Sequence, residues 1–550
     1  MEEIKVIIDG ERKNVGFLSE YKSIVGYGAR KYEENPVAGV LVNGKLSSLS
    51  ERIEGKEEIE SIHLFSPLGK RIYRKTLTLL LSYASSLVYP DRPLAIGHSL
   101  GDGYFFRYED GGAFDITLLK EKMNDIVRRK AGIEKVRLCH EDALRYAEKS
   151  AQKETVILLE SINASGYDFL KCGTYYQLYT EPVLPDFSLV TLWEIREYAD
   201  GILLRYPQTR SITSILPFAD NPLLFSIFEE SRRNKDVLSV RSIGELNDCI
   251  ADNTIGHKIL LMEAQQRRKI IKIADMILAK KSARIIYIAG PSSSGKTTFS
   301  LKLSDELRIM GKKAIKISLD DYYKPRREVP RDESGDYDYE VLSALNLELF
   351  RTQVKALLEG QEIHLPSFSF IKQETIFSDE GCRMDEDTYL VVEGIHGLNP
   401  ELLPDIDESL SFKIYISALT LLNLDSNTRI STTDNRIIRR MVRDNRTRGF
   451  DAVETISRWP SVERGEKNHI FPYQNNADVM INSALDYELA VLAPKAIPLL
   501  RMVKKKEKAA YPTAQRLLSF LSFISPIDTT AVPSDSILRE FIGGSVYTAI

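Results

Sequence analysis

The chain has 550 residues with 43% hydrophobic and 28% charged content, which is typical of globular proteins and too long for one hydrophobic core. No apolar stretch approaches the roughly 20 residues of a membrane span, and the start lacks the basic and apolar regions of a secretory signal, so we expect a cytoplasmic protein with no membrane partner. The net charge of -4 disfavours a protein that coats nucleic acid, and four scattered cysteines indicate neither a zinc site nor a disulfide framework.

The first half of the chain predicts mixed α/β structure. Short runs that alternate apolar and polar residues, such as IKVIID and AGVLVNG, predict a small β-sheet over residues 1–62. Residues 63–207 combine helical patterns, such as RKTLTLLLSYASSLVYP, with a glycine-rich turn and strand in AIGHSLGDGYFF. Residues 208–283 predict mainly helices that lead to the second half.

The second half, residues 284–503, alternates β-branched apolar runs with helical stretches. The runs are RIIYIAG, KAIKISLDD, TYLVVEGI, SFKIYIS and ADVMINS. Such alternation predicts a doubly wound parallel sheet that helices cover on both faces. Residues 504–550 predict a helical tail.

The stretch GPSSSGKTT lies between a predicted strand and a predicted helix, and its GxxxxGKT spacing is that of a phosphate-binding loop (P-loop). Glycines let backbone N–H groups surround phosphate oxygens, Lys296 reaches the β- and γ-phosphates, and the Thr297 hydroxyl is a ligand of Mg²⁺. A chance glycine- and serine-rich turn is the alternative, which the flanking strand and helix disfavour. The predicted nucleotide-binding residues are Gly290, Ser292, Ser293, Ser294, Gly295, Lys296, Thr297 and Thr298.

Acidic residues end two of the predicted strands. KAIKISLDD ends in Asp320 and Asp321, at the carboxyl edge where ligands of doubly wound sheets bind. Asp320 can accept a proton there from a hydroxyl that attacks the γ-phosphate. YLVVEGI places Glu393 at its end, like a Walker B carboxylate that holds Mg²⁺. A solvated turn is the alternative for both sites.

The stretch NRIIRRMVRDNRTRGFD is more cationic than a solvated helix requires. Its arginines are Arg436, Arg439, Arg440, Arg443, Arg446 and Arg448. Guanidinium groups on a closing segment suit the negative charge of a phosphoryl group in transfer. A basic surface helix is the alternative.

In order and approximate spacing, GPSSSGKTT, ISLDDYY, PSFSF, VVEGI and RRMVRDNRTRGFD resemble the uridine kinase and phosphoribulokinase-like family over residues 284–490. The resemblance implies an ATP- and Mg²⁺-dependent kinase that phosphorylates the 5′-hydroxyl of a nucleoside. It implies catalytic roles for Asp320, Lys296, Arg440 and Arg443, a nucleotide contact for Arg448, and metal ligation by Thr297 and Glu393. The implied substrate-binding residues are Asp320, Asp332, Phe368, Phe370, Gln373 and Arg443. The family's uridine kinases have a tyrosine at Phe368 and a histidine near Gln373, so the base preference stays open.

The first half resembles other families. PVAGVLVNGKLSSLSERI is similar to the small β-grasp domain called TGS, and LVYPDRPLAIGHSLGDGYFF to the second domain of threonyl-tRNA synthetase, which holds an editing site. The editing histidines align with Lys75 and Leu79, and a downstream Cys/His pair falls near Leu170 and Thr174, so we expect no hydrolytic editing. His98 is then expected to be structural.

Together these motifs resemble the long bacterial uridine kinase-like nucleoside kinases. They imply an α/β protein in which a P-loop kinase with a doubly wound parallel sheet follows a β-grasp domain and an α+β synthetase-like domain. The predicted parts are a TGS-like domain (1–62), a synthetase-like domain (63–207), a helical connector (208–283), a P-loop nucleoside kinase domain (284–503) and a C-terminal helical tail (504–550).

Two other functions stay open. One is a kinase of another hydroxylated metabolite, such as a sugar phosphate, although Asp332 favours a neutral sugar because a carboxylate repels a second phosphate. The other is an RNA-binding regulator that uses nucleotide as a switch, which an intact set of base, metal and arginine residues disfavours. The predicted partners are a nucleoside, ATP and a second copy of the chain, and RNA binding by the first half is left open.

Overall fold

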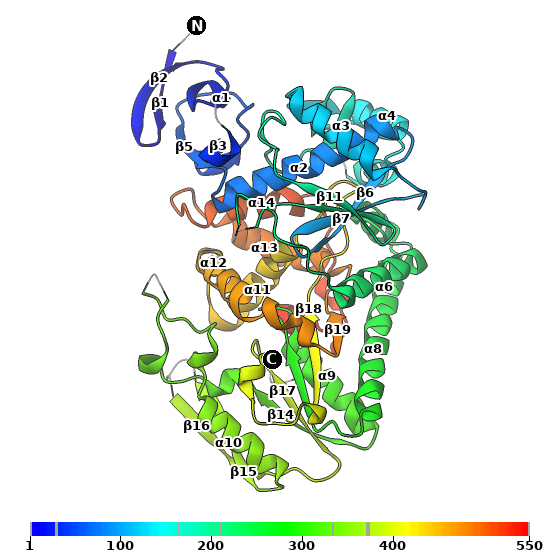
Figure 1. Cartoon of the computed structure of the whole chain (residues 1–550), viewed down its shortest axis with the longest axis vertical. Coiled ribbons are helices and arrows are strands. Elements are labelled where there is room, and N and C mark those ends of the chain that lie inside the picture. The colour runs from blue at the N-terminus through cyan, green and yellow to red at the C-terminus, as the bar shows by residue number, and fades with distance from the viewer. Residues whose placement is uncertain are drawn as a thin grey trace. The chain divides into compact units, whose positions relative to one another are not determined.

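The computed structural model describes residues 3–27, 31–162, 164–208, 211–332, 335–369 and 374–547. The chain divides into two compact units (Figure 1). Unit 1 comprises Met1–Ile255, Leu421–Ser431 and Ala493–Pro526, and unit 2 comprises Gly256–Thr420, Thr432–Leu492 and Ile527–Ile550. Within the described ranges, every helix is too short or too polar to cross a membrane.

Unit 1 begins with a five-stranded sheet in the order β2-β1-β5-β3-β4. Its elements are β1 (Glu3–Ile8), β2 (Glu11–Gly16), α1 (Tyr21–Ile24), β3 (Val37–Val42), β4 (Lys45–Ser47) and β5 (Glu58–His63). The central pair β1 and β5 is parallel and the other pairs are antiparallel. Alternate residues of β1, Val6 and Ile8, are buried, as a sheet with one covered face requires. This is the arrangement of a β-grasp sheet, as the sequence predicts.

The rest of unit 1 mixes helices with two antiparallel sheets, in the orders β10-β9-β8 and β11-β12-β7-β6. The helices are α2 (Pro67–Val88), α3 (Ile116–Arg128), α4 (His140–Lys149), α5 (Lys153–Glu160), α6 (Pro222–Leu238), α7 (Ile243–Ala251) and α14 (Tyr511–Leu521). The strands are β6 (Leu94–Leu100), β7 (Gly103–Tyr108), β8 (Glu134–Cys139), β9 (Gly166–Cys172), β10 (Tyr175–Leu178), β11 (Glu194–Tyr198) and β12 (Gly201–Arg205). Helix α2 starts where Ser66 Oγ accepts a hydrogen bond from Gly69 N at 3.1 Å, and its buried face includes Leu77 and Leu80.

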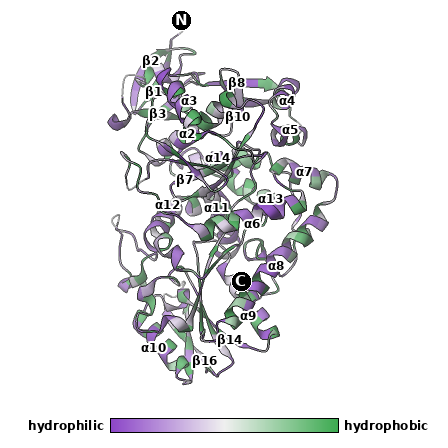
Figure 2. Cartoon of the chain, turned by 45° about the vertical axis from the view of Figure 1, so that its right-hand side comes forward, coloured by the Kyte–Doolittle hydropathy of each residue, from purple (hydrophilic) through white to green (hydrophobic). Residues whose placement is uncertain are grey.

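Unit 2 contains a parallel sheet in the order β14-β17-β13-β18-β19 (Figure 1). Its strands are β13 (Ile285–Ala289), β14 (Lys313–Ser318), β17 (Thr388–Glu393), β18 (Ser411–Ser417) and β19 (Val479–Asn482). Strands β13 and β17 are buried at every position, and Figure 2 shows the hydrophobic colour along the central strands. Ile286 and Ile288 pack into one hydrophobic cluster, while Ile285 and Tyr287 pack into another. The predicted doubly wound parallel sheet is therefore confirmed.

The other elements of unit 2 surround this sheet or follow it. The helices are α8 (Ile255–Ala279), α9 (Lys296–Ile309), α10 (Leu347–Leu358), α11 (Thr432–Arg448), α12 (Ala452–His469), α13 (Glu488–Arg501) and α15 (Arg539–Ile542), of which α8 and α13 continue across the boundary with unit 1. A hairpin is formed by β15 (Ile363–Ser369) and β16 (Glu374–Cys382). Short 3₁₀ helices occur at Tyr32–Glu34, Leu319–Tyr322, Arg326–Glu328, Leu342–Ala344, Pro400–Leu402, Glu408–Leu410, Phe471–Asn476 and Thr529–Ala531.

Candidate active site

The predicted P-loop connects β13 to α9 at the carboxyl edge of the parallel sheet. Gly290 leaves the strand so close to β18 that a Cβ atom there would lie 1.9 Å from Ile416 O. Gly295 adopts a φ of +81°, which favours glycine, directly before α9 begins at Lys296. Lys296 Nζ donates hydrogen bonds to Gly290 O at 3.0 Å and to Pro291 O at 3.2 Å. The ammonium group therefore lies across the loop, and a cradle of this shape fits the phosphates of ATP.

The two residues predicted to bind Mg²⁺ are in direct contact. Thr297 Oγ1 donates a hydrogen bond to Glu393 Oε1 at 3.1 Å, and Ser318 Oγ is 3.4 Å from the same oxygen. Burial raises the pKa of the Glu393 carboxyl, and Lys296 partly offsets this. Among the described residues there is no cluster of three or more His, Cys, Asp or Glu side chains that could bind a metal. A hydroxyl and one carboxylate fit Mg²⁺, which commonly keeps several waters and phosphate oxygens as its other ligands.

The neighbouring acids Asp320 and Asp321, which follow β14, have different surroundings. Asp321 Oδ1 accepts a hydrogen bond from Phe368 N at 3.1 Å, and burial raises the pKa of its carboxyl. This bond connects the end of β14 to the β15–β16 hairpin. The side chain of Asp320 is exposed at the carboxyl edge of the sheet. Asp320 is thus accessible to a substrate hydroxyl, whereas Asp321 supports the structure.

Three predicted site arginines of α11 share one buried carboxylate, that of Asp444. Asp444 Oδ2 is 3.2 Å from Arg440 Nε, and Asp444 Oδ1 is 3.0 Å from Arg443 Nη2 and 3.7 Å from Arg448 Nη1. Arg440 Nη1 also donates a hydrogen bond to Ser292 Oγ at 3.0 Å. Three positively charged guanidinium groups are thus opposed by one negatively charged carboxylate. This side of the site therefore has a net positive charge.

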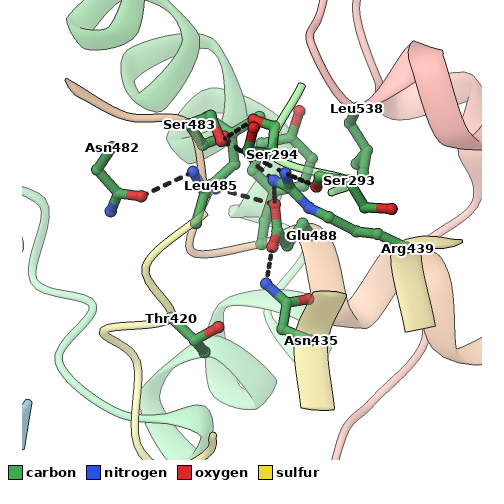
Figure 3. A network of polar contacts seen from close by, with 12 residues as sticks. Ser293, Ser294, Thr420, Asn435, Arg439, Asn482, Ser483, Leu485, Glu488 and Leu538 are labelled. Atoms are coloured by element: carbon green, nitrogen blue, oxygen red, sulfur yellow. Dashed lines mark hydrogen bonds and ion pairs between the residues drawn. The ribbon is translucent and has the colours of Figure 1, made fainter. Parts of the chain in front are cut away.

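The other buried arginines of α11, Arg436 and Arg439, each have a buried carboxylate partner. Arg436 forms a two-pronged ion pair with Glu466, and its Nε donates to Ser292 O at 2.9 Å. Arg439 is ion-paired with Glu488, and its Nη1 donates to Ser293 O at 3.3 Å, within the network of Figure 3. In the same network Ser483 Oγ donates to Ser294 O at 2.5 Å. These residues hold the P-loop in place, so α11 is not a plain basic surface helix.

Two carboxylates that the sequence analysis missed accept hydrogen bonds from the P-loop itself. Glu466 Oε1 accepts from Ser292 N at 3.0 Å. Glu540 Oε2, on α15, accepts from Thr298 N at 3.2 Å and from Thr298 Oγ1 at 2.9 Å. They lie 174 and 242 residues after their partners, so no local spacing could have indicated them.

Glu340 is a further acid near the site that the sequence analysis did not single out. Burial raises the pKa of its carboxyl to about 7, and Glu466 and Asp320 add to this while Arg440 opposes it. A Cβ atom at Gly465 of α12 would lie 2.4 Å from Glu340 Cβ, so only glycine permits this approach. The site therefore contains an acid that changes charge near neutral pH.

The residues predicted to bind the substrate are only partly described. Asp332 Oδ2 accepts a hydrogen bond from Arg464 Nη2 at 2.7 Å, and its Oδ1 accepts one from Asp336 N at 3.0 Å. Phe368 is buried in a hydrophobic cluster, with its ring 6.2 Å from that of Tyr323. Phe370 and Gln373 lie outside the described residues.

The positions aligned with an editing site lie in unit 1. Leu79 is fully buried in α2, and burial lowers the pKa of Lys75 one turn earlier. Leu170 is buried in β9, and Thr174 lies in the turn to β10. His98 is buried and stacks on Phe228, and burial holds the pKa of its imidazole well below the usual value.

Comparisons with known proteins match the two halves of the chain separately. The model of the "Phosphoribulokinase / Uridine kinase family" matches residues 285–490. A uridine kinase of Halobacterium salinarum is 30% identical over 197 residues, which cover 36% of this chain and 78% of that protein. A uridine kinase of Saccharomyces cerevisiae is 29% identical over 252 residues, which cover 45% of this chain and 46% of that protein.

The N-terminal part is similar to a protein of another kind. A threonine–tRNA ligase of Caldanaerobacter subterraneus subsp. tengcongensis is 28% identical over 156 residues, which cover 28% of this chain and 24% of that protein. The resemblances to uridine kinases and to threonyl-tRNA synthetase that the sequence motifs indicate are therefore confirmed.

Proposed function

The chain belongs to the phosphoribulokinase and uridine kinase family, and on this basis we propose that it is a nucleoside kinase that transfers the γ-phosphoryl group of ATP to the 5′-hydroxyl of a nucleoside. That it is a P-loop kinase follows from the family. The phosphoryl-transfer chemistry rests on the site, where Lys296, the Thr297–Glu393 pair and Arg440 converge on one loop and exposed Asp320 follows β14. The choice of a nucleoside as acceptor rests on the similarity to uridine kinases.

In the proposed reaction, the N–H groups of the P-loop and the Lys296 ammonium hold the β- and γ-phosphates of ATP. Asp320 takes the proton of the acceptor hydroxyl as its oxygen attacks the γ-phosphorus, and ADP leaves. Arg440, Arg443 and Arg448 neutralise charge on the phosphoryl oxygens. Thr297 and Glu393 would hold Mg²⁺, which would supply positive charge to the phosphates of ATP.

We further propose that Asp332 hydrogen-bonds the sugar hydroxyls and that Phe368 contributes to the base pocket. The second candidate substrate is another hydroxylated metabolite that already carries a phosphate. The ion pair of Asp332 with Arg464 favours this candidate, because it weakens the repulsion that a free carboxylate would exert on an anion.

The five-part domain division, the TGS identity of residues 1–62, the homo-oligomer and the cytoplasmic location remain predictions. An RNA-binding role for the first half also remains open.

The test is phosphoryl transfer from ATP to a panel of nucleosides and sugar phosphates, by wild type and by two neighbouring variants. Asp320→Asn is expected to lower turnover by roughly 10²-fold or more with ATP affinity unchanged, the usual scale for loss of a general base. Asp321→Asn, with the same charge change, is the control and retains most turnover. If the chain phosphorylates only sugar phosphates, the proposal that its substrate is a nucleoside is refuted. If it phosphorylates none of the compounds and only tRNA stabilises it, the RNA-binding regulator is favoured.

A further inference from the structure

Residues Leu421–Ser431 belong to unit 1, although they lie in the sequence between β18 and α11 of unit 2. The segment makes a tight turn in which Leu424 N donates to Thr428 O at 2.9 Å. It is joined to β6 because Ile96 N donates to Ser426 O at 2.7 Å. Three of its four leucine and isoleucine side chains are buried: Leu422, Leu424 and Ile430. The segment is therefore an internal element of unit 1, not a surface loop.

Arg429 of this segment is part of a cationic group around Tyr104 of β7. Its guanidinium carbon is 5.5 Å from the centre of the Tyr104 ring, and that of Arg74 on α2 is 5.2 Å from the centre of the Tyr206 ring. The two rings are 5.1 Å apart. We name these residues, with the nearby cations of α2, the Tyr104 cluster: Arg71, Arg74, Lys75, Tyr104, Tyr206 and Arg429.

The cations of the Tyr104 cluster exceed the carboxylates that face them. Arg71 is ion-paired with Glu181, and Asp425 attracts Lys75 from a longer distance. In the described part of the chain, Arg74, Lys75 and Arg429 have no carboxylate within ion-pair distance. The buried Arg429 Nε likewise has no hydrogen-bond partner there. Because charges removed from water are costly without a counter-charge, this arrangement favours an added anion.

The Tyr104 phenol lies in a positive local potential. Burial raises its pKa, but Arg74 and Arg429, with smaller effects of Tyr206 and Arg71, outweigh burial and hold that pKa below its usual value. For Lys75 the cause is different, because burial lowers its pKa while Glu181 and Asp425 oppose the shift. A phenol that its cationic neighbours shift toward the anionic form indicates that negative charge is stabilised beside Tyr104.

We propose that the Tyr104 cluster binds the phosphate group of a small anionic ligand, and that its occupancy is transmitted through Arg429 to α11. The four cations Arg71, Arg74, Lys75 and Arg429 face the two carboxylates Glu181 and Asp425, and a phosphate monoester with about −1.5 to −2 charges matches the excess. Guanidinium groups bind such oxygens with paired hydrogen bonds. Helix α11, which carries the site arginines, begins at Thr432, three residues after Arg429.

The test is calorimetric titration of the full-length chain with pyrophosphate, without Mg²⁺. Because the P-loop also binds phosphates, Lys296→Ala serves as the parent protein. Pyrophosphate is expected to bind this parent, and a second change, Arg429→Ala or Arg74→Ala, should weaken binding at least about tenfold through loss of paired hydrogen bonds. Arg128→Ala, an exposed arginine of α3, is the matched control and should keep the affinity. No binding to the parent, or equal affinity in all variants, would overturn the site.

Hydrogen exchange in the same parent tests the second half of the proposal. Pyrophosphate should slow amide exchange in residues 421–431 and in the first turn of α11, and Arg429→Ala should abolish this. Asn427→Ala, whose side chain lines a different cavity of about 360 Å³ with Ser85 and Tyr146, controls for loosening of the segment and should keep the protection. Protection confined to unit 1 would refute transmission to α11.

A third measurement distinguishes the sources of the phosphate. A short RNA with a 5′-phosphate is compared with the same RNA without it. If only the phosphorylated RNA binds in an Arg429-dependent way and pyrophosphate does not, the small-ligand proposal is overturned.

Discussion

Two groups of arginines in this chain, one buried in α11 and one partly buried in unit 1, differ in what neutralises them. In α11, Arg436 and Arg439 each have a buried carboxylate of their own, from Glu466 and Glu488. In the Tyr104 cluster, Arg74 and Arg429 pack over tyrosine rings and have no ion pair among the described residues. A cation with its own counter-ion is complete without a ligand, whereas a cation without one attracts an external anion. In this chain the arginines with a carboxylate of their own support the fold, and those without one are suited to binding.

Substitution of Lys296 has the largest expected effect on activity. Its ammonium group hydrogen-bonds two carbonyls of the P-loop, and we count it among the cations that are suited to binding an anion. Lys296→Ala should lower turnover by about 10³-fold or more, since the ammonium meets charge that shifts in the transition state, and should leave the free energy of unfolding almost unchanged. A coupled ATP assay and urea unfolding measure the two. Lys312→Ala, which removes an exposed lysine paired with Asp387, is the control. Turnover near wild type would remove the P-loop from the mechanism.

The comparison of arginines is sharpest in stability. Arg436→Ala should cost about 3 kcal/mol or more, because it leaves the Glu466 charge buried and unpaired. Arg74→Ala should cost no more than about 0.5 kcal/mol, because no carboxylate loses its partner. Urea unfolding of the two variants measures both values. Equal costs would break the distinction between paired and unpaired cations.

Glu540 allows the corresponding test for a carboxylate instead of a cation. Its carboxylate accepts hydrogen bonds from Thr298, in the loop where a nucleotide phosphate would bind. Glu540→Gln removes a negative charge near a helix N-terminus, and should lower the KM for ATP by about twofold to fivefold. Glu328→Gln, at an exposed acid, should leave KM unchanged. A higher KM in Glu540→Gln would mean that Glu540 shapes the loop for ATP.

Glu340 gives the smallest expected effect, a slope of stability with pH. Its pKa is raised in the folded chain to about 7 from 4.5, so the folded state binds more protons than the unfolded state between these values. Stability from this group is therefore lost as pH rises, by about 1 kcal/mol between pH 6 and pH 8. Glu340→Gln should flatten the slope measured by urea unfolding at these pH values. If the slope is unchanged in Glu340→Gln, groups other than Glu340 cause the pH dependence of stability.

The sequence predicts what depends on neighbours along the chain. The GxxxxGKT spacing predicts the loop between β13 and α9, and the alternating apolar runs predict the parallel sheet. It cannot separate Arg436 and Arg439 from Arg440 and Arg443, because helical spacing does not reveal which side chain meets a buried glutamate.

Partners that are distant in the sequence were missed for the same reason. Glu540 lies 242 residues after Thr298 in the sequence, and the two residues come into contact only in the folded chain. The assignment of Leu421–Ser431 to unit 1 likewise depends on tertiary packing of an apolar turn, which carries no local signal.

The interleaving of the two units has a consequence for how the chain is made. Unit 1 includes Ala493–Pro526, so the ribosome must synthesise nearly the whole chain before this unit has all its parts. Domains in tandem fold from the N-terminus as they emerge, but here the first 255 residues emerge before segment Leu421–Ser431 and the last stretch. A fragment that starts near residue 250 keeps Leu422, Leu424 and Ile430 without the unit 1 residues that bury them, and exposed apolar surface of this kind promotes aggregation. No single cut yields a complete unit, so a nascent chain that stops early is a substrate for chaperones and proteases.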